Sequence, residues 1–380
     1  MTYKIVLIIL AVLVSVCALM FISVIFIKLM ERRRNKEKEK DTKKINPVLH
    51  KLFSAEKAEF EKSCEHSLSK LSRTLRRKNQ LNTLEDILLD LLENADEETA
   101  ERARIIAYYF KFPEKCSHMI RDRIAGRAAI GCLKAGLYRY KDAVPDILKA
   151  LDILSSDTQL QAMVALARIG DIDAMTQSYE KISSHVFINE RAFFEIIDIF
   201  SGDRYELYKR MINHWSAYLV HHFLKSIDKE LALRLIDDIV AIYNKGEKES
   251  RLASVIAIGV SGSKKKIPLL IGALKDEEWE IRAMAAKTLG ILTGAKAIKP
   301  LALAVQDSEW WVRQNAATSI LAYPDHTEIL LSIIKKGDKY AYESILFALE
   351  KANKTRLISK IKKAWLETTK SGSVKNRNVR

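Results

Sequence analysis

The sequence predicts an all-α protein in which an N-terminal transmembrane helix precedes a right-handed α-solenoid built from helical pairs. Three observations lead to this fold class. Residues 5–27 form a run of 23 residues without a charge, and a segment near residue 280 recurs 31 residues later. Turn-forming residues are also scarce, with 13 Gly and 6 Pro among 380 residues. This composition favours helices over a chain rich in hairpins.

The apolar run from Ile5 to Ile27 is long enough to cross a membrane. A transmembrane helix needs about 20 consecutive apolar residues, and here the charges begin only at Lys28. The alternatives are a cleaved signal peptide, whose apolar stretch spans about 7–15 residues, and a lipoprotein signal at Cys17. Both fit less well, because the run is longer and does not end in a small-residue cleavage site.

Basic residues after the run set the expected orientation. Residues 28–44 hold nine Lys or Arg against four acidic residues. Because Lys and Arg beside a span favour the cytoplasmic side, we expect a single-pass protein of the cell (inner) membrane with residues 1–4 outside and the C-terminal domain in the cytoplasm. Residues 28–47 would be a basic juxtamembrane linker that contacts anionic lipid headgroups or serves only as a stop-transfer signal. The basic cluster includes Arg32, Arg33 and Arg34.

The net charge of +15 is concentrated at the two ends of the chain. Residues 351–380 carry ten Lys or Arg and one acid, whereas residues 45–350 are close to neutral. Because a central groove for nucleic acid requires a basic stripe on the folded body, nucleic acid is not an expected partner. The four cysteines do not form a disulfide framework.

Residues 48–119 are expected to form the helical N-terminal part of the solenoid. Apolar residues recur at helical spacing through residues 48–77. Thr83 stands before Leu84 as a candidate N-cap, which predicts a helix from Leu84 to about Glu93. A further helix is expected from Glu97 to about Phe112, ended by Pro113.

An internal repeat gives the clearest signal in the chain. Residues 278–290 align with residues 309–320 at a constant offset of 31, and the same step backwards places Arg251 on Arg282. Two helical stretches per unit at a fixed period of this length are typical of an α-solenoid.

The recurring residue types suit such a unit. Asp276 and Asp307 stand where a helix begins, so we expect them to cap backbone donors. Gly259 and Gly290 are expected to end the first helix of their unit in a left-handed turn. Three arginines recur on one face of successive units, where they can donate to an Asp or a carbonyl of an adjacent repeat and form a structural ladder. These are Arg251, Arg282 and Arg313.

The pattern D-x-x-W-x-[IV]-R-x-x-A-A resembles the HEAT repeat in its short bacterial form, the bilin-lyase-like repeat. The resemblance is specific over residues 250–322 and weaker over 120–175, while 175–245 departs from the pattern but keeps apolar spacing. It implies HEAT-like repeats over residues 120–366, with a degenerate capping unit near 337–366.

The resemblance implies a scaffold or adaptor rather than an enzyme, because extended solenoid surfaces suit protein binding. Anchored HEAT-repeat proteins of bacteria occur beside membrane glycosyltransferases, so it also implies a membrane-associated protein partner, such as an envelope-glycan glycosyltransferase complex. The alternative is a HEAT-like enzyme or nucleic-acid-binding module with a site on the concave face.

No catalytic motif stands out in the sequence. It contains no His-Glu dipeptide, which speaks against the di-iron hydroxylase branch of HEAT-like proteins, and no zinc-protease, nucleophile-elbow or complete phosphate-loop motif. Residues 259–264 superficially resemble a phosphate loop but fall at a turn between two helices. We therefore expect no catalytic residue and no cofactor.

Two Cys-x-His pairs are the only candidate metal ligands. A zinc site would need four such ligands, but residues two apart on a helix point about 200° from each other. Core or surface positions are therefore favoured over a metal site. The pairs are Cys64 with His66 and Cys116 with His118.

Tryptophans mark the most promising surface. Trp279 and Trp310 occupy equivalent repeat positions, with Trp311 beside the second. They either pack between repeats or form a protein-binding stripe, since aromatic residues favour interface hot spots. Residues 354–365 predict either a helix that caps the solenoid or a helix that binds a membrane surface or an acidic partner, and residues 367–380 predict a disordered basic tail.

Overall fold

A computed structural model describes residues 2–122, 124–152, 156–183 and 190–377 of the chain. Within these ranges every regular element is a helix. The chain divides into two compact units, Met1–Asp171 and Ile172–Arg380. The prediction of an all-α fold is confirmed. The boundary between the two units, after Asp171, is not indicated by the repeat pattern of the sequence.

The first unit is built from helices of very unequal length. They are α1 (Thr2–Ser54), α2 (Lys57–Thr74), α3 (Lys78–Asn94), α4 (Glu97–Tyr109), α5 (Glu114–Ile120), α6 (Ala125–Leu137), the 3-10 helix η1 (Lys141–Ala143), α7 (Val144–Ala150) and α8 (Ser156–Ile169). Helices α5, α6, α7 and α8 pack against one another, and α3 packs against α1, α4 and α6.

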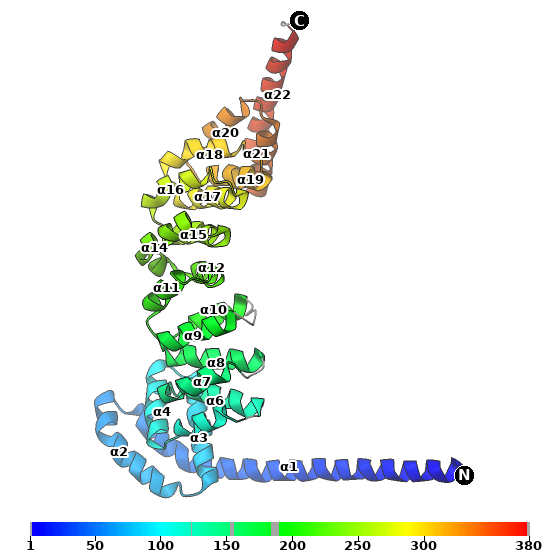
Figure 1. The fold of residues 1–380 in the computed structure, drawn as a ribbon, viewed down its shortest axis with the longest axis vertical. Helices are drawn as coiled ribbons and strands as arrows, with labels where there is room; N and C mark the ends of the chain where they lie inside the picture. Colours follow the sequence, from blue (N-terminus) through cyan, green and yellow to red (C-terminus); the bar gives the residue numbers. More distant parts are fainter. Residues whose placement is uncertain (1, 123, 153–155, 184–189, 378–380) are drawn as a thin grey trace. The chain divides into compact units, whose positions relative to one another are not determined.

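Helix α1 does not end after the apolar run. It continues through the charged residues 28–44 to Ser54, so the expected linker is helical (Figure 1). Its last third packs on α2 and α3, where Ile45, Leu49 and Leu52 are buried. It stops at Ser54 because the guanidinium of Arg102 donates hydrogen bonds to the carbonyls of Leu52, Phe53 and Ala55, at 3.2, 2.9 and 2.7 Å.

The transmembrane helix expected at residues 5–27 is not supported. Across the residues described, no helix combines the length and the apolar character needed to cross a bilayer. The prediction of a cell-membrane protein with an external N-terminus and a cytoplasmic domain is therefore wrong. The apolar residues belong to a single long helix whose charged remainder joins the folded unit. The side chains of residues 1–12, and thus the expected external segment 1–4, lie outside those described.

Two local expectations in the first unit also differ from the structure. The apolar pattern of residues 48–77 is divided between α1 and α2 rather than forming one helix. Thr83 lies inside α3, where its hydroxyl donates to the carbonyl of Asn79, because α3 already begins at Lys78. The side-chain amide of Gln80 accepts the backbone N–H of Arg77 at that true start.

The second unit contains the repeated helices. They are α9 (Ile172–Ser183), α10 (Glu190–Asp198), α11 (Arg204–Ile212), α12 (Ala217–Ser226), α13 (Lys229–Arg234), α14 (Ile236–Lys245), α15 (Lys248–Ser261), η2 (Lys264–Lys266), α16 (Ile267–Ala273), α17 (Trp279–Leu292), η3 (Ala295–Ala297), α18 (Ile298–Ala304), α19 (Trp310–Ile320), α20 (His326–Ile334), α21 (Lys339–Lys351) and α22 (Thr355–Arg377).

Helices of equivalent position stack in series within this unit. The series α12, α15, α17, α19 and α21 packs each helix on the next, and α16, α18 and α20 cover one side of it (Figure 1). Helices α15, α17 and α19 begin at Lys248, Trp279 and Trp310, which are 31 residues apart. These helical pairs therefore bury their apolar faces against their neighbours in the stack, as in an α-solenoid.

Glycine allows the stacked helices to approach closely. Gly259 and Gly290 were expected to end helices, but both lie inside α15 and α17. A Cβ atom on Gly290 would lie 2.9 Å from Cα of Ser319, and one on Gly259 would lie 2.9 Å from Cγ2 of Thr288. The left-handed residue that ends α15 is Gly262 instead, with φ of 68°. The two repeat glycines thus serve packing rather than chain reversal.

The C-terminal segment is helical beyond the expected boundary. Helix α22 runs from Thr355 to Arg377, so most of the predicted disordered tail 367–380 continues the capping helix, and residues 378–380 lie outside those described. Leu357 and Ile361 are buried against the preceding helices, and the ring of Trp365 stacks on Tyr342 at 4.5 Å. These contacts anchor the first three turns of α22.

A buried charged pair joins α3 to α6 in the first unit. The ammonium of Lys134 lies 2.6 Å from Oε1 of Glu85, whose side chain is only 9% exposed. The buried Tyr138 hydroxyl donates to the same oxygen at 3.2 Å. Burial raises the pKa of Tyr138, so this hydroxyl stays protonated as a donor. The sequence gives no sign of this network, because Glu85 and Lys134 are 49 residues apart.

We predict that Lys134→Met lowers the free energy of unfolding by about 3 kcal/mol, because it leaves the Glu85 carboxylate buried without a cation. The double variant Glu85→Gln/Lys134→Met should recover most of this loss, since it removes the buried charge and keeps an acceptor for Tyr138. Urea denaturation of the full chain measures both. A single variant as stable as the wild type would contradict the prediction.

Candidate functional site

An arginine of each repeat binds the aspartate that begins the next repeat. Arg282 of α17 forms a two-pronged pair with Asp307, with Nε 2.9 Å from Oδ2 and one terminal nitrogen 3.0 Å from Oδ1. Its other terminal nitrogen donates to the carbonyls of Asp276 and Glu277, at 2.9 and 3.1 Å. Both partners are 14% exposed, so the pair holds two successive helix starts together in a mostly dry environment.

The same arrangement occurs one repeat earlier. Arg251 of α15 pairs with Asp276, whose side chain is 5% exposed, and the Tyr243 hydroxyl donates to the same carboxylate at 3.4 Å. The remaining oxygen of Asp276 accepts the backbone N–H of Glu278 at 3.0 Å. The aspartate therefore lies two residues before the N-cap position that we expected it to occupy, and it orders the loop that leads into the helix.

Arg313 of α19 is the last arginine of this series and is bound differently. It donates to the carbonyls of Asp307 and Ser308, at 2.8 and 2.7 Å. In the next repeat, its Nε donates to the hydroxyl of Ser344 at 3.4 Å. Its guanidinium also lies 5.2 Å from the ring centre of Tyr340. Ser344 stands 31 residues after Arg313, so the series of arginines ends at the capping unit.

The environment of Asp307 shifts its ionisation. Burial alone would raise the pKa of this carboxyl, but the hydrogen bonds from Arg282 and from the backbone N–H of Glu309, together with the arginine charge, outweigh burial and lower it. The carboxylate form is therefore favoured in the folded chain.

The predicted tryptophans lie directly after the loops that the repeat arginines bind. Trp279 begins α17 and Trp310 begins α19, and each follows the repeat aspartate by three residues. Trp279, Trp310 and Trp311 are 36%, 40% and 55% exposed. Trp310 packs edge-on against Trp311, with ring centres 4.6 Å apart. The rings are thus partly packed and partly open to solvent.

Two further aromatic residues of α21 extend this surface. Phe347 lies 5.7 Å from Trp310 between ring centres and is 47% exposed. Tyr340 is 63% exposed and is the residue on which Arg313 rests. Sequence reasoning missed both because the last unit loses the tryptophan motif. The 31-residue offset carries Asp307 onto Asp338, and that match could have placed α21 beside α19. We call Trp279, Trp310, Trp311, Tyr340 and Phe347 the aromatic surface.

The other candidate residues belong to the first unit, whereas the aromatic surface belongs to the second. Arg32, Arg33 and Arg34 are exposed on α1 in the first unit. Cys64 and Cys116 are buried, whereas His66 and His118 are exposed. Burial raises the pKa of the Cys116 thiol to about 12. In the ranges that the structure covers, no three His, Cys, Asp or Glu side chains are grouped to hold a metal ion.

Residues 236–322 match a family model described as HEAT repeats. This range spans α14 to α19 and contains both arginine–aspartate pairs. The prediction of HEAT repeats from the tryptophan–arginine motif is confirmed there. No curated protein matches the chain.

Two solved structures are similar in part. One is from the complex of CpcE and CpcF of phycocyanin lyase from Nostoc sp. PCC7120, with 15% identity and a TM-score of 0.26, covering 67% of this chain and 94% of that chain. The other is an engineered protein with 15% identity and a TM-score of 0.33, covering 80% of this chain and 98% of that chain.

Removal of the Arg282 side chain should weaken the repeat array. We predict that Arg282→Met lowers the free energy of unfolding by about 3 kcal/mol, because Asp307 loses its cation and two carbonyls lose their donor. Arg282→Lys should lower the free energy of unfolding by about 1–2 kcal/mol, since a lysine keeps the charge but cannot bind both carboxylate oxygens as the guanidinium does.

The control is Arg191→Met, which removes a side chain that is 89% exposed and that, among the described residues, is paired with Glu195. An exposed pair of this kind contributes less than about 1 kcal/mol. Chemical denaturation followed by circular dichroism gives all three values. Equal stability of the Arg282→Met and Arg191→Met variants would show that the pair does not hold the repeats together.

The contribution of the Arg282–Asp307 pair to the free energy of unfolding should also depend on pH. Because the pKa of Asp307 is lowered on folding, its stabilisation is present above the unfolded pKa of about 3.9 and is lost as the pH falls through the lower folded value. The stability difference between wild type and Arg282→Met should therefore be largest near pH 7 and shrink in acid, as Asp307 becomes protonated first in the variant and then in the wild type. A difference that grows in acid would refute this assignment.

Proposed function

We propose that this chain, which carries HEAT repeats over residues 236–322, is a non-enzymatic scaffold that binds a protein partner through the aromatic surface. HEAT-repeat helical scaffolds suit protein interaction because stacked repeats present extended surfaces. The observation that carries the proposal is the half-exposed Trp310–Trp311 pair on a backbone that Arg282 and Arg313 hold in place.

The aromatic surface has the features of an interface hot spot. Tryptophan and tyrosine dominate binding energy where a rigid ring can be covered by a partner. Trp310 contacts Trp311 and Phe347, Tyr340 contacts Arg313, and Trp279 occupies the position equivalent to Trp310 one repeat earlier. Exposed carboxylates stand beside them at Glu277 and Glu309. The partner segment is therefore proposed to offer an apolar anchor with basic residues next to it.

The alternative of an enzyme or a nucleic-acid module on the concave face has less support. It would need arginines and aspartates free to act on a ligand, whereas the repeat arginines and aspartates bind one another and the backbone. The near-neutral charge of residues 45–350 also disfavours a nucleic-acid groove.

The structure gives no support for a membrane-bound partner. The resemblance to anchored HEAT-repeat proteins implies the envelope-glycan glycosyltransferase complex, and the basic run beside residues 5–27 implies contact of Arg32, Arg33 and Arg34 with anionic lipid headgroups. Both need the chain to be held at a membrane. With the transmembrane helix unsupported, the proposal is limited to a protein partner.

Truncation of the exposed rings tests the proposal. A partner recovered with the full chain should bind the Trp310→Ala/Trp311→Ala variant at least about tenfold more weakly, because hot-spot rings contribute about 2 kcal/mol or more each. Binding is measured between the two purified proteins by calorimetry.

Trp215→Ala is the matched control. Trp215 is 83% exposed and lies in the same unit but outside the aromatic surface. We expect this variant to keep wild-type affinity. If both variants bind equally well, or both lose binding to the same extent, the aromatic surface is not the binding site.

A further inference from the structure

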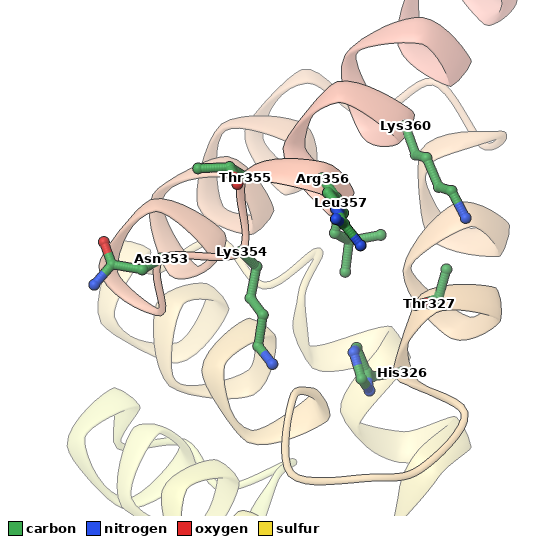
Figure 2. A pocket seen from close by; sticks show the side chains of 8 residues that line it. All are labelled: His326, Thr327, Asn353, Lys354, Thr355, Arg356, Leu357 and Lys360. Carbon is green, nitrogen blue, oxygen red and sulfur yellow. The ribbon is translucent and has the colours of Figure 1, made fainter.

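A basic pocket lies between the start of α20 and the start of α22. It has a volume of about 360 Å³, within the range of small-ligand sites. Arg356 and Lys360 enter it from α22, Lys354 from the residue just before that helix, and His326 and Thr327 from α20 (Figure 2). The remaining lining residues are Asn353, Thr355 and Leu357.

The charge of this pocket is one-sided. Three of its lining side chains are lysine or arginine and none is acidic. Ion pairs elsewhere in the unit engage many arginines and lysines, but in the described part of the chain neither Lys354, Arg356 nor Lys360 lies within 4.0 Å of a carboxylate. Three like charges around one cavity repel each other unless an anion enters it.

Polar groups complete the pocket. Thr327 and Thr355 offer hydroxyls, and the Nδ1–H of His326 donates to the carbonyl of Tyr323 at 2.8 Å, which fixes the ring against the cavity. Helix α22 is 23 residues long and points its N-terminus at the same space. Among the described residues the backbone N–H groups of Thr355 and Arg356 have no carbonyl acceptor, so they add donors to those of the cations.

We propose that the pocket between α20 and α22 binds a phosphate-class oxyanion that carries two or more negative charges. A single carboxylate would balance only one of the three cations, whereas a phosphate monoester carries about −1.5 to −2 charges and three acceptor oxygens. Arginine and the hydroxyls match the geometry of such an anion. This site is separate from the aromatic surface and does not rest on the proposed scaffold function.

Titration of the full chain with inorganic pyrophosphate tests the proposal. At an ionic strength of about 0.15 M, saturable binding is expected by calorimetry, and Arg356→Gln/Lys360→Gln should weaken it about tenfold or more. The matched control is Lys362→Gln/Lys363→Gln, which removes the same charge from exposed positions of the same helix outside the pocket. The control should change the affinity less than about threefold.

Citrate serves as the carboxylate arm of the experiment. Markedly weaker binding of citrate than of pyrophosphate supports a phosphate-class ligand, and equal or tighter binding overturns that assignment. Absence of saturable binding to the wild-type chain overturns the site itself. Equal losses in the pocket variant and the control variant would also overturn it, because they would show only the general attraction of a basic helix. Circular dichroism confirms that both exposed double variants stay folded.

Discussion

Two successive repeats of the second unit are each tied to the next by one arginine that reaches the aspartate before the following helix. Arg251 binds Asp276 and Arg282 binds Asp307, while Arg282 also satisfies the carbonyls at the start of its own helix. The two partners of each pair are 25 residues apart within a period of 31. A shift of one repeat by one residue relative to the next would therefore separate the arginine from its aspartate. Because a buried carboxylate without its cation is costly, the pairs select a single register for α15, α17 and α19. The close approach of Gly290 to Ser319 depends on that same register.

The surfaces of this unit follow from the fixed register. The loops held by Arg282 and Arg313 lead directly into Trp279 and Trp310, so the rings stand on backbone that does not need to be ordered when a partner binds. Such preorganisation favours binding, because less conformational entropy is lost. At the capping unit the arginine series ends on Ser344 and Tyr340. There α22 covers the array and leaves its basic first turn facing α20.

The sequence predicts the repeats well because their signal is local and regular. The matching residues of 278–290 and 309–320 define α17 and α19, and the recurrence of Arg and Asp indicates a ladder before any coordinate is known. Other features depend on tertiary contacts that local patterns do not carry. Thr83 resembles an N-cap, yet α3 starts earlier where Gln80 supplies the cap. Gly259 and Gly290 resemble helix ends but are contact points. The contact of Phe347 with Trp310 lies in a unit that has lost the tryptophan motif, and the Glu85–Lys134 pair joins positions that no sequence repeat relates.

The aromatic surface on α17, α19 and α21 is the proposed binding site for a protein partner. Photocrosslinking from single positions of the full chain tests this most directly, with a photoreactive residue placed at position 311 or 340 and, for comparison, at position 215. The account predicts one reproducible adduct from positions 311 and 340, joined to the same short segment of one protein, and no such adduct from position 215. Adducts that are the same from all three positions, or absent from 311 and 340, would contradict it.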